Sequence, residues 1–463
     1  MCRPRLIPLL ALTLVLGAGP ARPSRAQWHA DGAPVCTAAF NQGYPTIVSD
    51  DAGGTIVTWE DMRGGTSYDI YAQRLDAGGM PQWTADGVAL CAAAYDQEYP
   101  KIVSDGAGGA VVIWQDYRSG TNWGIYAQRV DAAGASQWSA DGVALCTTAN
   151  AQWGPSIASD GAGGAIVTWE DLRGTYSDIY AQRVDAAGAP QWNPEGVALC
   201  AAAYSQQTPR VVEDGAGGAI VTWSDGRSQA TSWDIYAQRV NATGVTQWAA
   251  DGVALCTARN GQFGPAGMFS DGAGGAIVAW TDGRNGNTNG DIYAQHLLAS
   301  GAGDPAWTPN GVALSAAAES QYSPMMVSDG AGGAIVTWHD YRSGTNWDIY
   351  AQRIYGAGAV AAVSPPGAPA HFQLFAPSPN PTRDGRLSIR FSLPASGRVS
   401  AQVLDLAGHR VRTLATEREF SPGLQVLGWD GRNDAGAGLP SGVYFVEVRV
   451  GTHSEARRAV LLR

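Results

Sequence analysis

The sequence predicts an all-β protein: a six-bladed β-propeller of four-stranded blades, followed by a small Ig-like β-sandwich. A pattern of about 55 residues occurs six times along the chain. A repeat of that length, with no helical periodicity inside it, is typical of propeller blades. The chain has 463 residues with 60 Gly and 25 Pro, and 45% of it is hydrophobic. This composition indicates turn-rich β structure with a substantial core.

Each repeat contains a Trp-x-x-(Asp/Glu/Asn)-Gly element, a Gln-x-x-Pro step, a hairpin and a third strand. In the third repeat the hairpin strands are expected at 155–160 and 165–171, and the third strand at 178–184. The Asp-Gly-x-Gly-Gly turn between the hairpin strands supplies residues that tolerate positive φ. The run Ala165–Trp169 is nearly all apolar, as expected for a strand packed on both faces. The repeats begin at Trp28, Trp83, Trp138, Trp192, Trp248 and Trp307.

The phase of the repeat predicts how the propeller closes. The chain opens with a fourth-strand element, Trp28–Cys36, and ends its last repeat with three strands over 324–354. We therefore expect Trp28–Cys36 to pair beside Asp348–Arg353 and complete the last blade. Closure would remove two exposed sheet edges. We expect a monomer.

The start of the chain has the features of a signal peptide over 1–26. Arg3 and Arg5 precede the apolar run Leu6–Gly17, and a small-residue cleavage site ends at Ala26. No later run reaches the roughly 18 apolar residues of a spanning helix. The propeller is expected over 27–358, a Pro/Ala/Gly linker over 359–371 and the second domain over 372–463.

The charge and the cysteines exclude several kinds of site. The net charge is −11, which disfavours binding to nucleic acid or anionic lipid. No Cys/His spacing suggests zinc, and the Asp-Gly turns lack the aspartate ladder of a calcium loop. We expect no cofactor or metal. Buried free thiols are expected at the repeated cysteine position, because equivalent positions on separate blades lie too far apart for a disulfide. These residues are Cys36, Cys91, Cys146, Cys200 and Cys256.

The last 90 or so residues carry an ordered set of motifs outside the repeat. Residues 387–393 alternate strictly, with Leu387, Ile389, Phe391 and Leu393 on one face. The other motifs are Pro379–Pro381, Val403–Leu414, Trp429–Gly436, Ser441–Phe445 and Ala459–Arg463. Together they resemble the type A sorting domain of the type IX secretion system, which shares an Ig-like fold with flagellar hook-capping proteins. The resemblance implies the secretion machinery as a partner, and a secreted or outer-surface location in a Gram-negative-type bacterium.

A Trp-x-Asp-x-Arg element recurs in all six repeats. Its Asp and Arg side chains lie two residues apart, on one side of a strand end. A repeated ion pair that locks each blade to its loop is the favoured interpretation, and a ring of ligand-binding arginines is the alternative. The pairs are Asp61/Arg63, Asp116/Arg118, Asp171/Arg173, Asp225/Arg227, Asp282/Arg284 and Asp340/Arg342.

The candidate binding residues are aromatic. The loops after the second strand and before the first strand are expected on one face of the propeller. Flat apolar rings beside polar side chains are typical of sugar or peptide binding, although the rings could instead pack between blades. His339 stands where other repeats have Glu, Gln, Ser or Thr. The candidate residues are Tyr68, Trp123, Trp233, Trp347, Tyr44, Tyr99, Trp153, Phe263, Tyr322 and His339.

These observations favour a non-catalytic, secreted or surface-attached recognition protein that binds a glycan or another macromolecule. A glycan-cleaving, sialidase-like hydrolase is one alternative. Such an enzyme needs a single arginine triad, a Tyr–Glu pair and an acid, whereas the Arg and Tyr residues here recur in most repeats. We expect no catalytic residues. A purely structural surface scaffold is the other alternative.

Overall fold

The computed structural model describes residues 31–228, 232–286, 289–360, 372–382, 385–394, 396–421, 423–451 and 453–462. The chain divides into two compact units, with the division between Val360 and Ala361. The expected signal peptide and Trp28 lie outside the described residues. Within the described part of the chain, no helix is long and apolar enough to cross a membrane.

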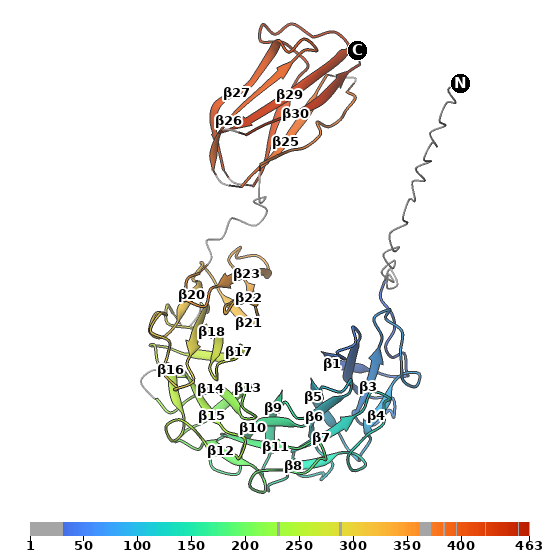
Figure 1. Ribbon diagram of the computed structural model, residues 1–463, viewed down its shortest axis with the longest axis vertical. Helices are drawn as coiled ribbons and strands as arrows, with labels where there is room; N and C mark the ends of the chain where they lie inside the picture. The colour runs from blue at the N-terminus through green and yellow to red at the C-terminus, as the bar shows by residue number, and fades with distance from the viewer. Residues whose placement is uncertain are drawn as a thin grey trace, which may run out of the picture. The chain divides into compact units, whose positions relative to one another are not determined.

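The first unit consists of six antiparallel sheets, the blades, which follow one another in chain order (Figure 1). Blade 1 contains β1 (Gln42–Ser49), β2 (Thr55–Asp61), β3 (Asp69–Leu75) and β4 (Val88–Cys91). Blade 2 contains β5 (Gln97–Ser104), β6 (Ala110–Asp116), β7 (Gly124–Val130) and β8 (Val143–Cys146). Blade 3 contains β9 (Gln152–Ser159), β10 (Ala165–Asp171), β11 (Asp178–Val184) and β12 (Val197–Cys200).

The remaining three blades continue the pattern until the last, which has three strands. Blade 4 contains β13 (Gln206–Glu213), β14 (Ala219–Asp225), β15 (Asp234–Val240) and β16 (Val253–Cys256). Blade 5 contains β17 (Gln262–Ser270), β18 (Ala276–Asp282), β19 (Asp291–Leu297) and β20 (Val312–Ser315). Blade 6 contains β21 (Gln321–Ser328), β22 (Ala334–Asp340) and β23 (Asp348–Ile354). The predicted all-β fold with repeated four-stranded blades is confirmed.

The turn between the first two strands of each blade is held by its aspartate. In blade 3, Asp160 Oδ1 accepts the N–H groups of Ala162 at 2.8 Å and Gly164 at 2.9 Å. Its Oδ2 binds Arg183 of β11 at 2.9 Å. A Cβ on Gly164 would lie 2.2 Å from the Val184 carbonyl oxygen, so only glycine fits there. In blade 5, His296 takes the place of the arginine.

Neighbouring blades pack face to face through apolar side chains. Ile166 and Ile179 of blade 3 lie against Val221 and Trp223 of blade 4, and all four are 0% exposed. Strand β14 is buried at every position, as predicted for the second strand of a repeat. The Trp223 indole N–H donates to Asp225 Oδ2 at 2.7 Å, so its polar group is satisfied inside the core.

A bulge in the first strand of a blade provides a polar tie to the blade before it. In β5, Tyr99 has a φ of 55° and the pairing register shifts between Glu98 and Lys101. The Tyr99 N–H donates to Glu60 Oε1 of blade 1 at 2.6 Å. The same tie joins Gly154 to Gln115 at 2.9 Å, Thr208 to Glu170 at 2.8 Å and Gly264 to Ser224 at 3.0 Å.

The expected closure of the ring is not found in the described residues. Blade 6 has three strands, and residues 31–41 form no strand. Figure 1 shows β1 and β21–β23 at the two ends of the row of blades. Cys36 lies instead on blade 1, with Sγ 3.4 Å from the Arg63 guanidinium. The contact with the following blade therefore forms, while residues 31–36, the described part of the predicted strand, do not pair beside Asp348–Arg353.

The repeated cysteines are free thiols, as predicted. Four are buried and Cys36 is half-buried. Burial raises the pKa of Cys146 to about 12. Among the described residues, the nearby Gln152 Oε1 is buried without a hydrogen-bond partner. In the last junction, where Ser315 replaces the cysteine, its hydroxyl donates to Gln321 Oε1 at 3.4 Å.

The second unit is a sandwich of two antiparallel sheets, ordered β24-β25-β28 and β27-β26-β29-β30. As predicted, Leu387, Ile389, Phe391 and Leu393 are buried together on the inner face of β25. Phe391 packs edge-on against Phe420, with ring centroids 5.4 Å apart. The strands are β24 (Gln373–Leu374), β25 (Leu387–Leu393), β26 (Gly397–Leu404), β27 (Arg410–Phe420), β28 (Gly423–Trp429), β29 (Gly442–Val450) and β30 (His453–Leu461).

Candidate ligand-binding face

Backbone hydrogen bonds between blades bring the aromatic loops next to the first strands. The N–H of Gln152, at the start of β9, donates to the carbonyl of Trp123 in the blade 2 loop at 3.1 Å. The same bond joins Gln97 to Tyr68 at 2.8 Å and Gln262 to Trp233 at 2.7 Å. Each loop therefore lies beside the first strand of the next blade, on the same face.

The clearest aromatic group spans blades 2 and 3. The ring centroids of Trp123 and Trp153 are 6.0 Å apart, and those of Trp123 and Tyr117 are 5.0 Å apart. Tyr95 also contacts Tyr117, with ring centroids 6.1 Å apart. Trp153 is 37% exposed. The group thus combines rings that pack on each other with one ring that remains open to solvent.

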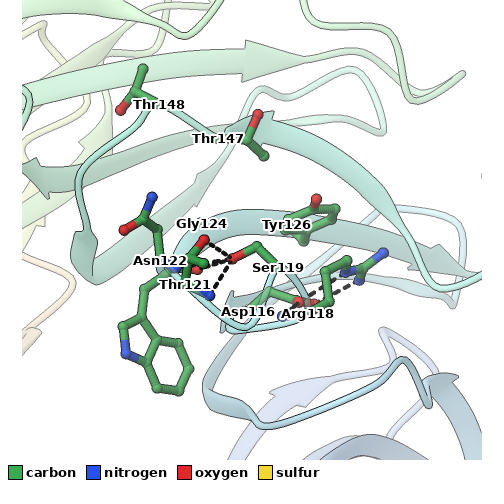
Figure 2. A pocket seen from close by; sticks show the side chains of 10 residues that line it. Asp116, Arg118, Ser119, Thr121, Asn122, Gly124, Tyr126, Thr147 and Thr148 are labelled. Carbon is green, nitrogen blue, oxygen red and sulfur yellow. Dashed lines mark hydrogen bonds and ion pairs between the residues drawn. The ribbon is translucent and has the colours of Figure 1, made fainter.

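A cavity of about 280 Å³ lies beside this group and is lined mainly by polar side chains. Figure 2 shows Ser119, Thr121 and Asn122 on the loop after β6, with Thr147 and Thr148 on the segment after β8. The Ser119 hydroxyl donates to the Asn122 carbonyl at 2.8 Å and accepts the Asn122 N–H at 2.9 Å. These two bonds within the loop fix its shape. Its hydroxyl and amide groups are suited to hydrogen-bond a polyhydroxylated molecule.

The repeated arginines hold the blades together. Arg173 binds Asp171 at 2.7 Å and stacks 3.8 Å above the Tyr180 ring. The ion pair predicted from the sequence is confirmed in all six blades, with distances from 2.5 to 2.7 Å. Burial raises the pKa of Asp171, but hydrogen bonds from Arg173 and Trp169 outweigh it and hold that pKa below its ordinary value.

The aspartate at the start of the third strand behaves in the opposite way. Asp178 is paired across the sheet with Asp171. Burial and the neighbouring Asp171 charge raise the pKa of Asp178 to about 6. In blade 1, burial and Asp61 likewise raise the pKa of Asp69 to about 6. Each of these two blades thus holds one carboxylate that favours ionisation and one that resists it.

Blade 6 carries a second version of the blade 2 group. Trp347 is 52% exposed, and its ring centroid lies 5.9 Å from Tyr322, 6.4 Å from His339 and 5.0 Å from Tyr341. The Ser343 hydroxyl donates to the loop carbonyl of residue 346 at 3.0 Å, as Ser119 does in blade 2. His339 therefore belongs to an aromatic group, as a neighbour of Trp347.

The other predicted residues are distributed along the face. Trp233 lines a cavity of about 360 Å³ together with Tyr176 and Tyr204, whose ring centroids are 5.5 Å apart. Tyr44 and Tyr99 form an edge-on pair at 5.3 Å. Among the described residues, Tyr68 and Phe263 make no ring–ring contact. The face therefore holds separate aromatic groups between blades.

Sequence reasoning missed five tyrosines of these groups: Tyr117, Tyr341, Tyr95, Tyr176 and Tyr204. A signal for the first two was present, because the octapeptide Asp-Tyr-Arg-Ser-Gly-Thr-Asn-Trp occurs identically at 116–123 and 340–347. The tyrosine stands where the other repeats have Met, Leu or Gly. Identity of a whole loop between two repeats indicates a shared local structure beyond the blade pattern.

Comparison with solved structures finds distant likenesses. PorZ of Porphyromonas gingivalis, described as a bacterial surface component of the type IX secretion system, is 13% identical with a TM-score of 0.36; the match covers 88% of this chain and 58% of PorZ. A Dyadobacter fermentans protein of unknown function is 11% identical over 69% of this chain and 95% of that chain, with a TM-score of 0.39.

An α-L-arabinanase from Penicillium chrysogenum, solved with arabinobiose, is 12% identical with a TM-score of 0.32; the match covers 67% of this chain and 92% of that one. Likenesses at these TM-scores carry no argument about function. Among curated proteins, none matches the chain. Residues 380–454, within the C-terminal sandwich, match the FlgD Ig-like domain family.

Proposed function

We propose that this protein is a non-catalytic recognition protein of the cell surface or the secreted fraction, and that its aromatic face binds a glycan. The observation that carries the proposal is the Trp123–Trp153 pair, with ring centroids 6.0 Å apart, in which Trp123 also lines a cavity with hydroxyl and amide groups. Aromatic faces stack on the apolar face of a sugar ring, and nearby polar groups fix its orientation.

The arginines support binding over catalysis. In every blade the loop arginine is paired with its own aspartate and stacked over a tyrosine ring. The third-strand arginines are paired with the turn aspartates. Arginines held in this way have structural partners already, whereas a sialidase-like site needs arginines directed at the substrate.

The C-terminal sandwich is proposed to direct export. The FlgD Ig-like match over 380–454 agrees with the resemblance to a type A sorting domain. We propose the type IX secretion machinery as its partner, and an outer-surface or secreted location in a Gram-negative-type bacterium. Fusion of residues 372–463 to a periplasmic reporter in a type IX-competent host tests this: appearance of the reporter outside the cell supports it, and retention in the periplasm contradicts it.

Binding is tested on a glycan and polysaccharide array with the chain from Gln27 onward. Trp153→Ala should weaken binding by about 5- to 150-fold, because stacking on one ring contributes about 1–3 kcal/mol. Tyr355→Ala is the matched control, since Tyr355 is also exposed, at 43%, but lies in the turn after β23.

Three results would contradict the proposal. Absence of binding to every glycan would favour a protein partner or a scaffold. Equal loss in the Tyr355→Ala variant would show that the effect is not specific to the aromatic face. Release of shortened glycans during incubation would favour the hydrolase alternative.

A further inference from the structure

The two end blades expose apolar side chains that the inner blades bury. On blade 6, Ile349 is 69% exposed and Ile335 is 42% exposed, while their equivalents in blade 1, Ile70 and Ile56, are both 0% exposed. Val327 beside them is 63% exposed. These three residues define the tail face. In the other blades this face packs against the next blade in the chain.

The opposite end of the row shows the complementary surface. Ile47 of β1 is 67% exposed, whereas Val211, its equivalent in blade 4, is 7% exposed because blade 3 covers it. We call the surface of β1 and β2 around Ile47 the head face. The tail face is the side a blade turns toward its successor, and the head face is the side a blade turns toward its predecessor. Apolar surface of this kind is normally covered in soluble proteins.

The segment before β1 already occupies the place of a preceding blade's fourth strand. The Arg63 guanidinium lies 3.4 Å from Cys36 Sγ, as Arg118 lies 3.2 Å from Cys91 Sγ at the next junction. The Thr37 N–H donates to Asp86 Oδ1 at 2.7 Å, as the Ala92 N–H donates to an aspartate of blade 2. The head face therefore presents a segment at the place of a fourth strand, and among the described residues no third strand lies beside it.

Blade 6 has the matching unpaired strand edge. Within the described part of the chain, its edge strand β23 pairs with no fourth strand, whereas β3, β7, β11, β15 and β19 each pair with one. The polar ties are also complementary. Between blades 1 and 2, the Tyr99 N–H donates to Glu60. The residue of blade 6 equivalent to Glu60 is His339. The residue of blade 1 equivalent to Tyr99 is Tyr44, whose N–H would be the donor. The Gln97 N–H also donates to the Tyr68 carbonyl across the junction of blades 1 and 2. The equivalent acceptor on blade 6 is the Trp347 carbonyl, and the equivalent donor on blade 1 is the Gln42 N–H.

We propose that the tail face of one chain binds the head face of a second copy of this chain. The contact repeats the interface that already joins each pair of consecutive blades, with residues 31–37 of the second copy placed beside β23. A second copy is favoured over closure within one chain because the two ends lie apart in the row of blades (Figure 1). A head-to-tail contact is heterologous, so it produces a closed ring or an open filament of copies.

The association would also complete a second cavity. The loop of residues 343–347 is identical to that of 119–123, but among the described residues no fourth strand of blade 6 leads into a segment that faces it. Thr37 of the second copy stands at the repeat position of Thr147, which lines the blade 2 cavity. Only this consequence rests on the proposed glycan binding; the association itself does not.

The test measures molar mass by light scattering after size exclusion, over a wide range of protein concentration and without any glycan. The chain from Gln27 onward should form multiples of its own mass as concentration rises. Ile349→Glu blocks the tail face and Ile47→Glu blocks the head face, and each variant alone should remain a monomer. Because both side chains are already mostly exposed, neither substitution should prevent folding.

A mixture of the two variants distinguishes this interface from any other. Each variant keeps one intact face, so an equimolar mixture should form a dimer with one copy of each and nothing larger. Val426→Glu is the matched control, since Val426 is 56% exposed on the C-terminal sandwich; it should associate like the unaltered chain. An unaltered chain that stays monomeric at every concentration, or a mixture that stays monomeric, would overturn the proposal, as would loss of association in the control.

Discussion

The Asp171→Asn substitution tests whether the repeated ion pair holds each blade together. The Asp171 side chain is 0% exposed. Its Oδ1 accepts the Arg173 N–H at 2.9 Å and Nε–H at 2.8 Å, and its Oδ2 accepts the Trp169 indole N–H at 2.9 Å. Asparagine keeps the shape but removes the charge, and it turns one acceptor oxygen into a donor that faces other donors.

The magnitude follows from these contacts. A hydrogen bond to a charged group contributes about 1.5–3 kcal/mol, and removal of one partner of a buried ion pair costs about 3–5 kcal/mol. The Arg173 side chain is 27% exposed, so water restores part of its solvation and favours the lower end of that range. We expect Asp171→Asn to lower the free energy of unfolding by about 3 kcal/mol.

The assay is urea unfolding at neutral pH, followed by tryptophan fluorescence. The matched variant is Asp178→Asn, which removes a carboxylate from the paired position on the neighbouring strand. Because the pKa of Asp178 is raised to about 6, its ionised form is unfavourable in the folded state, and the amide should stabilise the protein. A change for Asp171→Asn below about 0.5 kcal/mol would refute the reasoning. So would equal destabilisation by the two variants.

Two further predictions concern titration and the thiol position. Asp69 and Asp178 have folded pKa values of about 6, above the ordinary 3.8, so the folded state holds more protons in that window and its stability should fall as pH rises from about 4 to 6. Urea midpoints measured across this window should show the fall, and the double Asn variant should flatten it; an unchanged slope would contradict the assignment. Cys146→Ser should give Gln152 Oε1 the donor that Ser315 supplies in the last junction. The urea midpoint of Cys146→Ser should exceed that of Cys146→Ala. The reverse order would show that a serine at 146 does not reach Gln152 as Ser315 reaches Gln321.

Much of the fold follows from local pattern. The Asp-Gly-x-Gly-Gly turn and the apolar run Ala165–Trp169 specify a hairpin whatever surrounds it, because positive φ and two-sided burial are local requirements. The Asp171–Arg173 pair was likewise predictable, since side chains two residues apart share one side of a strand. These features recur in each repeat, so the same reasoning applies six times.

Closure of the ring could not be predicted in the same way. The phase of the repeat places Trp28–Cys36 at the position of a fourth strand, but whether this segment reaches Asp348–Arg353 depends on the angle between adjacent blades. That angle is set by the packing of many side chains and accumulates over five interfaces. Small differences at each interface therefore decide whether the ends meet.

The aromatic face shows a similar division. Exposed loop residues such as Trp347 were predictable from their positions between strands. Their grouping was not, because Trp123 meets Trp153 only through a hydrogen bond between blades that the sequence does not reveal. The tyrosines at 117 and 341 lie inside the Trp-x-Asp-x-Arg element, whose repeated role is structural, so the pattern gives no sign that they join an aromatic group.

The sameness of the junctions has a consequence for how this gene could change. The Trp83 indole N–H donates to the Ala132 carbonyl at 3.1 Å, and Trp138 makes the same bond to Ala186 at 3.1 Å. Excision of residues 84–138 would therefore join partners that already fit each other, with no compensating substitution. Unequal crossing-over between repeats should yield foldable chains with fewer or more blades. The number of blades can thus change by whole repeats while the sequence of each loop changes separately. The size of the protein and the ligand specificity of its loops can therefore evolve independently.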